Sequence, residues 1–243
     1  MKTIPLFVTL SLLVLNACGP SGGPGSSGEK TPVAAADTQV VEAVDLWPLE
    51  VGNQWTFEVE EVLEAPNVPA DRRRFERVLK VTKAAPNEGG KTAELAVLDQ
   101  DGKALGVIHI EVNKGGIYQL GMGSGNSKVM YEKPFPLMLW PAKKGEKSSW
   151  KGKGARPGIG TTGDISANFE QKGRAIVDSA AGRFSAYRFD TLQQYEVNKV
   201  KFETAQAAWF APGVGMVRSL ETVATSNGAR QSQKLVLKSH TVK

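Results

Sequence analysis

The feature that most constrains the fold is an alternation of apolar and polar side chains that recurs between residues 46 and 243. In QWTFEVEEV, which runs from Gln54 to Val62, the apolar residues Trp55, Phe57 and Val59 occupy every second position. A repeat of two is typical of a β-strand that buries one face, because successive side chains point to opposite sides of the sheet. The chain is therefore expected to form antiparallel strands with one covered face.

About a dozen runs of this kind follow one another, separated by short stretches such as APNEGG, DQDG, NKGG and SNGA. Asn, Asp and Gly at these places suit the tight turns of β-hairpins. No long segment has the helical period of about 3.6 residues. The sequence therefore predicts an all-β fold: a single antiparallel meander sheet, strongly curved or partly closed into a barrel so that few edges stay open.

The first eighteen residues, MKTIPLFVTLSLLVLNAC, have the layout of a secretory signal, with Lys2, an apolar run from Ile4 to Leu15, and Cys18. The apolar run is too short to cross a bilayer as a helix. We expect a signal peptide over residues 1–17, a flexible linker over 18–45, and the β-domain over 46–243. The linker prediction rests on a Gly-, Ser- and Pro-rich stretch without an aromatic residue. A plain secretory signal with a chance cysteine, or an uncleaved anchor, is the alternative.

The tetrapeptide LNAC, which ends at Cys18, resembles the lipobox of bacterial lipoproteins. The resemblance implies that Cys18 becomes the mature N-terminus and carries acyl chains such as palmitate, which anchor the protein to a membrane without spanning it. Gly19 stands where an aspartate would favour retention at the inner membrane in proteobacterial members. The implied location is the cell envelope, on the periplasmic face of the outer membrane or at the cell surface.

Residues that carry chemistry are sparse. Cys18 is the only cysteine, which leaves no disulfide, zinc thiolate or thiolate nucleophile in the β-domain. The two histidines, His109 and His240, stand outside any GxSxG or HExxH pattern. The glycine-rich segment GMGSGN, residues 121–126, is expected to be a hairpin loop because it lacks the GxGxxG spacing. We expect no cofactor, no metal site, no enzymatic activity and no nucleic-acid partner.

A stretch rich in Pro, Gly and Lys, from Lys133 to Gly160, interrupts the alternation and is expected to be a long irregular segment. It offers a candidate surface for anionic ligands or membranes, and a solvated loop kept soluble by lysines is the alternative. The candidate residues are Lys143, Lys144, Lys147, Trp150, Lys151 and Lys153.

Two segments echo each other, because Pro-Leu followed by Gly and then Trp occurs twice. The first copy contains Pro48, Gly52 and Trp55, and the second begins at Pro136 and ends at Trp150. The sequence leaves open whether they form a true repeat that joins two halves of the sheet.

Three motifs carry a resemblance to uncharacterised bacterial envelope proteins that pair an early PL..G..W.Y/F with AG.F.A and a late W(F/Y)APGVG.V. These motifs are signatures of turns and core residues. In this chain they are Pro48, Leu49, Gly52, Trp55 and Phe57, then residues 180–189, and then Trp209 to Val217.

More distantly, a lipid-anchored antiparallel sheet is similar to the curved half-barrels of periplasmic lipoprotein and lipid carriers, which hold acyl chains in an apolar concavity. That likeness implies a candidate apolar groove at Trp55, Phe57 and Trp209. Burial of Trp55 with its indole N–H bonded would favour a core role, whereas a place in an empty groove with Trp209 would favour a ligand.

The expected function is that of a lipid-anchored envelope protein with a non-enzymatic binding, assembly or structural role at the membrane surface, with an envelope protein as its partner. The alternative is a carrier or sensor of a lipophilic ligand in the concave face of the sheet.

Overall fold

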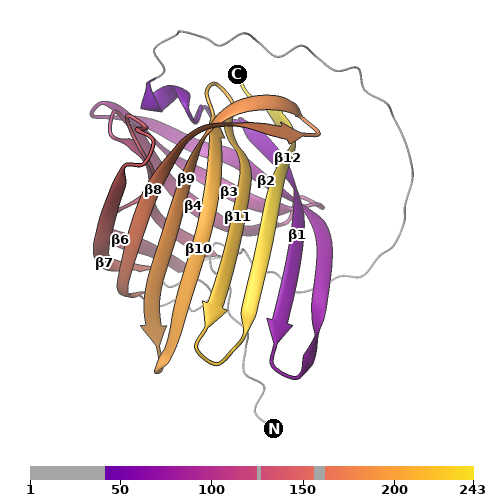
Figure 1. Cartoon of the computed structure of the whole chain (residues 1–243). Coiled ribbons are helices and arrows are strands. Elements are labelled where there is room, and N and C mark those ends of the chain that lie inside the picture. The colour runs from indigo at the N-terminus through magenta and orange to yellow at the C-terminus, as the bar shows by residue number, and fades with distance from the viewer. Residues whose placement is uncertain (1–41, 125–126, 156–161) are drawn as a thin grey trace.

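The computed structural model describes residues 42–124, 127–155 and 162–243, and these form one antiparallel sheet (Figure 1). A short 3-10 helix, η1 (Ala43–Asp45), precedes the strands. The strands are β1 (Gln54–Ala65), β2 (Val68–Asn87), β3 (Gly90–Asp99), β4 (Ala104–Asn113), β5 (Gly116–Ser124), β6 (Ser127–Leu139), β7 (Lys147–Ala155), β8 (Thr162–Ser179), β9 (Gly182–Val197), β10 (Val200–Ala211), β11 (Gly215–Thr225) and β12 (Arg230–Thr241).

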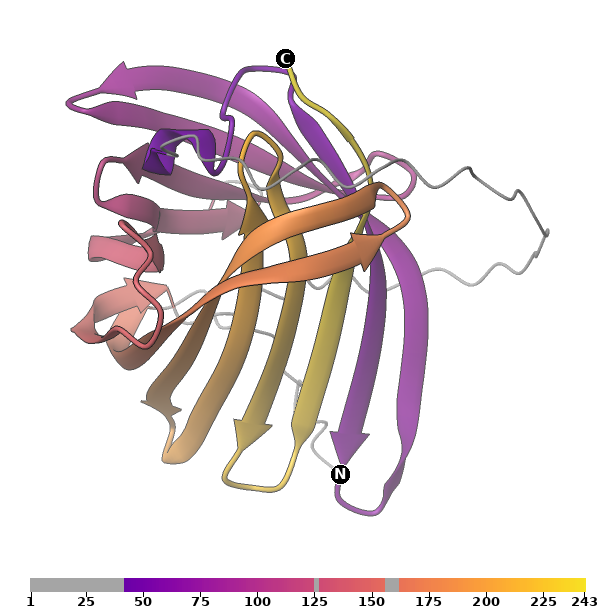
Figure 2. The ribbon, with the colours of Figure 1, turned by 45° about the horizontal axis from the view of Figure 1, so that its top comes forward.

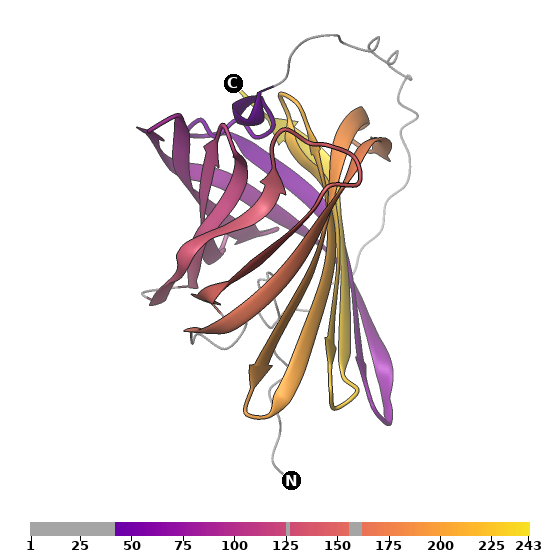
Figure 3. The same ribbon diagram turned by 60° about the vertical axis from the view of Figure 1, so that its left-hand side comes forward.

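The sheet is a meander whose two ends come back towards each other. Its order is β6-β5-β4-β3-β2-β1-β12-β11-β10-β9-β8-β7, so β1 pairs with β12 and the edge strands are β6 and β7. Figure 3 shows the sheet bent back on itself, with β3–β6 lying across from the strands that follow β8. The prediction of an all-β, strongly curved and partly closed meander is confirmed.

The two echoing segments occupy equivalent places, one leading into β1 and the other into β7. In the first, Gly52 donates its N–H to the carbonyl of Val81 on β2, and Val81 donates back to the carbonyl of Asn53, both at 2.9 Å. In the second, Gly145 and the residue after it make the same pair of bonds with Gln171 on β8, at 2.7 and 2.9 Å. The sheet therefore consists of two halves with the same plan, β1–β6 and β7–β12.

The matching hydrogen bonds of Gly52 and Gly145 align the two segments differently from the sequence echo, which pairs Pro48 with Pro136. Pro48 and Pro141 each stand four residues before the bonded glycine and each follow a tryptophan, so Trp140-Pro141 is the counterpart of Trp47-Pro48. The Pro-Leu pair at Pro136 lies inside β6 instead. In this correspondence β1 matches β7 and β12 matches β6, so the junction of β6 with β7 is the counterpart of the continuous β1–β12 ladder.

In the part of the chain that the structure describes, no ladder of backbone hydrogen bonds joins β6 to β7, and side chains hold the two strands together. Trp150 donates its indole N–H to the carbonyl of Pro134 at 3.0 Å. A Cβ at Gly154 would overlap the ring of Tyr131, so this ring lies directly on the β7 backbone. We call this junction the seam.

The prediction of an irregular segment from Lys133 to Gly160 is wrong for most of its length. These residues include the end of β6 and the whole of β7. Prolines are tolerated in β6 because an edge strand leaves N–H groups unused by a neighbour. Residues 156–160 lie outside the described residues.

The motifs at the two ends of the chain interlock over one end of the sheet. Gly213, in the APGVG turn between β10 and β11, donates to the carbonyl of Asp45 at 2.7 Å. Trp55 donates its indole N–H to the carbonyl of Val214 at 2.5 Å, and its ring meets Trp47 edge-on with centroids 5.9 Å apart. Gly215, at φ +103°, leaves room for the Trp47 ring that a Cβ would take.

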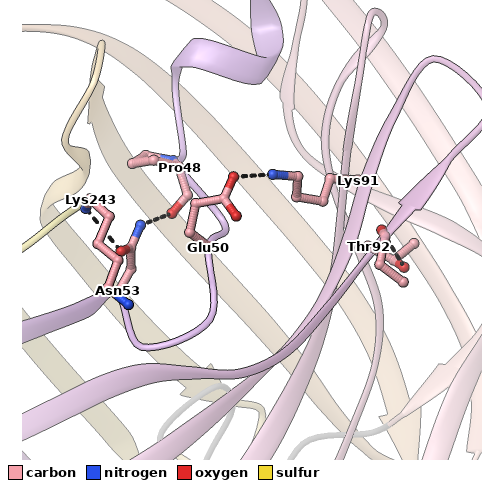
Figure 4. A network of polar contacts seen from close by, with 7 residues as sticks. Pro48, Glu50, Asn53, Lys91, Thr92 and Lys243 are labelled. Atoms are coloured by element: carbon pink, nitrogen blue, oxygen red, sulfur yellow. Dashed lines mark hydrogen bonds and ion pairs between the residues drawn. The ribbon is translucent and has the colours of Figure 1, made fainter.

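A second set of contacts ties the same segment to the C-terminus (Figure 4). Asn53 is fully buried, donates to the carbonyl of Pro48 at 2.9 Å and accepts from the N–H of Lys243 at 3.0 Å. Glu50 is paired with Lys91 on β3. The segment before β1 is therefore part of the fold.

The outer face is partly covered by the sheet's own hairpin. Figure 2 shows the end of the β8–β9 hairpin crossing over the strands that follow it. Phe184 of this hairpin lies 6.1 Å from the ring of His240 on β12. A shallow hollow of roughly 530 Å³ lies beside it, lined by side chains of both charges, among them Lys147, Glu170, Arg188 and Asp190, and by small or apolar ones such as Ala205, Ala207 and Leu220.

Candidate functional site

A row of polar side chains crosses the inner face of the sheet, on the side that carries Phe57 and Phe210. Each member is the direct cross-strand partner of the next, from β9 through β10, β11 and β12 to β1. We call it the inner polar row, and its members are Thr191, Gln206, Glu221, Gln233 and Glu61. Adjacent strands lie about 4.8 Å apart, so the row is about 19 Å long.

Four of the five members are buried although they are polar, and Gln206 is half-buried. Glu61 is 5% exposed, and Thr191, Glu221 and Gln233 are likewise buried. Glu61 accepts hydrogen bonds from the amides of Gln233, at 3.1 Å, and of Gln231, at 2.6 Å. A buried carboxylate needs such donors, because an unpaired buried charge costs several kcal/mol.

Some polar atoms beside the row lack a hydrogen-bond partner in the described part of the chain. These are the hydroxyl of Thr204, the side-chain carbonyl of Gln231 and the Nε of Arg77. Burial lowers the pKa of Arg77 to about 10, although the charges of Glu61 and Asp99 act in the opposite direction. Each unpaired buried group costs about 1–3 kcal/mol, and this arrangement is what a site awaiting a polar partner would have.

Tyr131, on the edge strand β6, reaches towards the row from the other side of the interior. Burial raises the pKa of its hydroxyl above the usual range, and the charges of Tyr195 and Glu221 add to the effect. Its ring stacks on Phe135 with centroids 5.5 Å apart. Tyr131 therefore packs at the seam and lies within electrostatic reach of Glu221, a member of the row.

The two halves of the sheet provide an internal comparison. The bonds to Val81 and Gln171 align the halves, so Leu79 and Val97 of the first correspond to Phe169 and Thr191 of the second. On the next strand, the cross-strand partner of Val97 is Gly106, and that of Thr191 is Gln206. The first half therefore folds with valine and glycine at the positions of Thr191 and Gln206, so the architecture does not require polar side chains at these two places.

The three residues of the predicted apolar groove do not come together on one face. Trp55 is 1% exposed and Phe57 is fully buried, both on the inner face. Trp209 lies on the outer face, where the guanidinium groups of Arg188 and Arg218 stand 5.0 and 5.3 Å from its ring centroid. Trp55 is thus buried with its N–H bonded, the arrangement that favours a core role.

The structure separates Trp150 from the lysines of the predicted basic surface. Trp150 is buried and faces inward, where its ring meets Phe135 with centroids 5.2 Å apart. The exposed lysines of the set are Lys143, Lys144, Lys147, Lys151 and Lys153. The lysines are available to an anionic partner without Trp150, and such binding stays a prediction.

The two histidines lie on separate strands. His109 on β4 places Nδ1 3.6 Å from a carboxylate oxygen of Glu94, and burial lowers its pKa, with the charge of Lys128 acting in the same direction. His240 on β12 contacts Phe184. Within residues 42–124, 127–155 and 162–243, no group of three His, Cys, Asp or Glu side chains is placed to hold a metal ion.

The predicted lipidation site, Cys18, lies outside the described residues. Among the helices that the structure describes, none has the length and apolar character needed to span a bilayer.

Sequence reasoning missed the inner polar row, although one signal was present. Glu60 and Glu61 are adjacent in β1, so one of them must face the covered side of the sheet. The structure places Glu60 outside, paired with Arg74 and Lys234, and Glu61 inside.

Comparison with known proteins gives fold matches only. No protein-family model matches the chain, and no curated protein matches it. The fold is similar to that of a candidate lipoprotein from Parabacteroides distasonis ATCC 8503, with a TM-score of 0.50 and 14% identity over 82% of this chain and 100% of that one. This likeness shows a shared architecture.

Two further solved structures are more distant. A candidate exported protein with a YmcC-like fold from Bacteroides fragilis NCTC 9343 has a TM-score of 0.48 and 18% identity, over 80% of this chain and 98% of that one. The hypothetical lipoprotein YmcC from Escherichia coli (K12) has a TM-score of 0.35 and 9% identity, over 74% of this chain and 83% of that one.

Proposed function

We propose that this protein is a lipid-anchored, non-enzymatic binding protein of the cell envelope that holds its ligand at the inner polar row. The observation that carries the proposal is the row itself. It places the polar residues Thr191 and Gln206 where the equivalent half of the same sheet has valine and glycine, and some neighbouring atoms have no partner among the described residues. A ligand that supplied those partners would offset a cost that the fold alone does not require.

The anchor is supported by the lipobox-like LNAC before the single cysteine, Cys18, and by the fold shared with a candidate lipoprotein. Replacing Cys18 with Ser is expected to move the processed protein from the membrane fraction to the soluble fraction. A processed Cys18→Ser chain that stays on the membrane would contradict the anchor.

The proposal includes no catalytic step. The amides of Gln231 and Gln233 hold the carboxylate of Glu61, an arrangement that fixes an acceptor and activates no nucleophile. A carrier of a wholly lipophilic ligand is the weaker alternative, because Trp55 and Phe57 are packed as core. An acyl chain would also offer no hydrogen bond to the atoms beside the row that lack a partner among the described residues.

The test is native mass spectrometry of the full-length protein, extracted from its membrane in mild detergent. We expect a noncovalent mass in addition to the anchored chain, lost on denaturation. Protein that carries only its covalent anchor, in every preparation, would overturn the proposal.

A further inference from the structure

The inner polar row has a composition that selects the chemistry of its ligand. Gln206 and Gln233 each provide amide donors and a carbonyl acceptor, Thr191 provides a hydroxyl, and Glu61 and Glu221 provide carboxylate acceptors. Hydroxyl groups are the ligand groups that both donate to carboxylates and accept from amides. A ligand carrying several hydroxyls can therefore bond to neighbouring members of the row at once, in addition to the bonds that Glu61 already accepts from Gln231 and Gln233.

The charge of the region argues against the common anionic ligands of an envelope. Two carboxylates, Glu61 and Glu221, lie in the row, and the adjacent buried cation is Arg77, whose guanidinium feels the charge of Glu61. A phosphate or sulfate placed along the row would meet two like charges in a buried setting, where repulsion is strong. An uncharged ligand meets no such penalty.

Aromatic side chains lie on the same inner face beyond the row. Tyr195 and Phe202 are cross-strand partners whose rings stack with centroids 5.0 Å apart and planes at 5°. They sit two inward-facing positions from Gln206 and Thr191 along their strands, with Thr204 between them. A sugar ring has hydroxyls at its edge and an apolar C–H face, so a polar row beside aromatic side chains suits it.

We propose that the ligand of the inner polar row is an uncharged glycan segment, lying across the strands from Thr191 to Glu61. This inference rests on the proposed binding function and names its ligand class. The row length of about 19 Å suits an extended chain of several sugars more than a single small molecule.

The expected route to the row is the seam. Tyr131, which lies near Glu221 and Tyr195, belongs to the edge strand β6, and its ring is held against Gly154 by packing and not by a ladder. Separation of β6 from β7 would withdraw this ring and break the Trp150–Pro134 bond, but it would break no continuous set of backbone hydrogen bonds. We therefore expect the ligand to enter at the seam.

The test is saturation-transfer NMR of the full-length protein in detergent with three uncharged probes: maltohexaose, cellohexaose and chitohexaose. We compare wild type with Glu61→Gln and with Glu60→Gln, adjacent glutamates on opposite faces of β1. We expect at least one hexasaccharide to bind. The inner substitution should weaken binding at least tenfold, as the loss of a charge-assisted hydrogen bond does, and the outer one should change it less than twofold.

Failure of this inference is distinguishable from failure of the binding function. If no hexasaccharide binds, or if Glu60→Gln weakens binding as much as Glu61→Gln, the glycan assignment is overturned. The binding function stands in that case if a lipid or peptide mass still accompanies the extracted protein and is lost in Glu61→Gln. Absence of both sugar binding and any bound mass overturns the two together.

Discussion

Replacing Glu61, Gln231 and Gln233 together by leucine is expected to leave the protein folded and at least as stable as wild type. In wild type the Glu61 carboxylate accepts from both amides, at 2.6 and 3.1 Å, and all three side chains are buried. Exchanging a buried polar cluster for apolar residues of similar size is often neutral or stabilises a protein by about 1–4 kcal/mol, because the desolvation cost disappears with the charge. We expect the free energy of unfolding to stay the same or to rise within that range. The gain is smaller than it would otherwise be because Arg77 loses the attraction of Glu61.

The single substitution Glu61→Leu is expected to have the opposite sign. It leaves the two amide groups without their acceptor, at a cost of about 1–3 kcal/mol for each, and the leucine offsets about 1.5–3 kcal/mol of this by burying apolar surface. The net expectation is a loss of about 1–3 kcal/mol. Glu60→Leu on the outer face breaks exposed ion pairs only and should change stability by about 0.5 kcal/mol or less.

The assay is urea denaturation of the full-length variants in detergent, followed by tryptophan fluorescence and circular dichroism, with the slope of each transition compared to ensure that midpoints report stability. A triple variant that loses more than about 2 kcal/mol, or that fails to fold, would show that the polar cluster is part of the architecture, and the physical argument for a binding site would be refuted.

Three further outcomes follow from the structure. Trp55→Phe removes an indole N–H from a buried bond to the β10–β11 turn and should cost about 2–4 kcal/mol in urea unfolding; a change below about 0.5 kcal/mol would mean that the turn is not held there. Gly154→Ala should cost about 1–3 kcal/mol and speed amide exchange in β6, since the new Cβ overlaps the Tyr131 ring; an equal cost in a Tyr131→Ala background would contradict this cause. Burial lowers the pKa of His109, so its contribution to stability is complete above the unfolded pKa of about 6.5 and is lost as pH falls through the folded pKa. His109→Gln should therefore make the free energy of unfolding depend less on pH between about pH 7 and 5. The same pH dependence in the variant as in wild type would argue against this role.

The sequence predicts the architecture well where the period of two is clear. Trp55, Phe57 and Val59 alternate in the printed chain and are all buried on one face of β1. The prediction is wrong in β7, where glycines at positions 152 and 154 follow Trp150 on the inward face, so a single large apolar side chain is too little to reveal the alternation. Backbone packing against Trp150 and Tyr131 explains those glycines, and it is visible only in three dimensions.

The inner polar row depends on register between strands that are far apart in the chain. Glu61 and Gln233 are cross-strand partners although 172 residues separate them. The sequence shows that Glu60 or Glu61 must face inward, and it places Gln231 and Gln233 on one face of their strand. It does not show that these side chains meet, because a slip of one residue would move each of them to the other face.

The binding account is tested most directly by the mass of the protein extracted from its membrane, compared between the triple leucine variant of Glu61, Gln231 and Gln233 and the outer-face variant Glu60→Gln. The account predicts that wild type and Glu60→Gln carry the same noncovalent mass and that the folded triple variant carries none. A folded triple variant that keeps the bound mass would contradict it, because the ligand would then lie elsewhere on the protein.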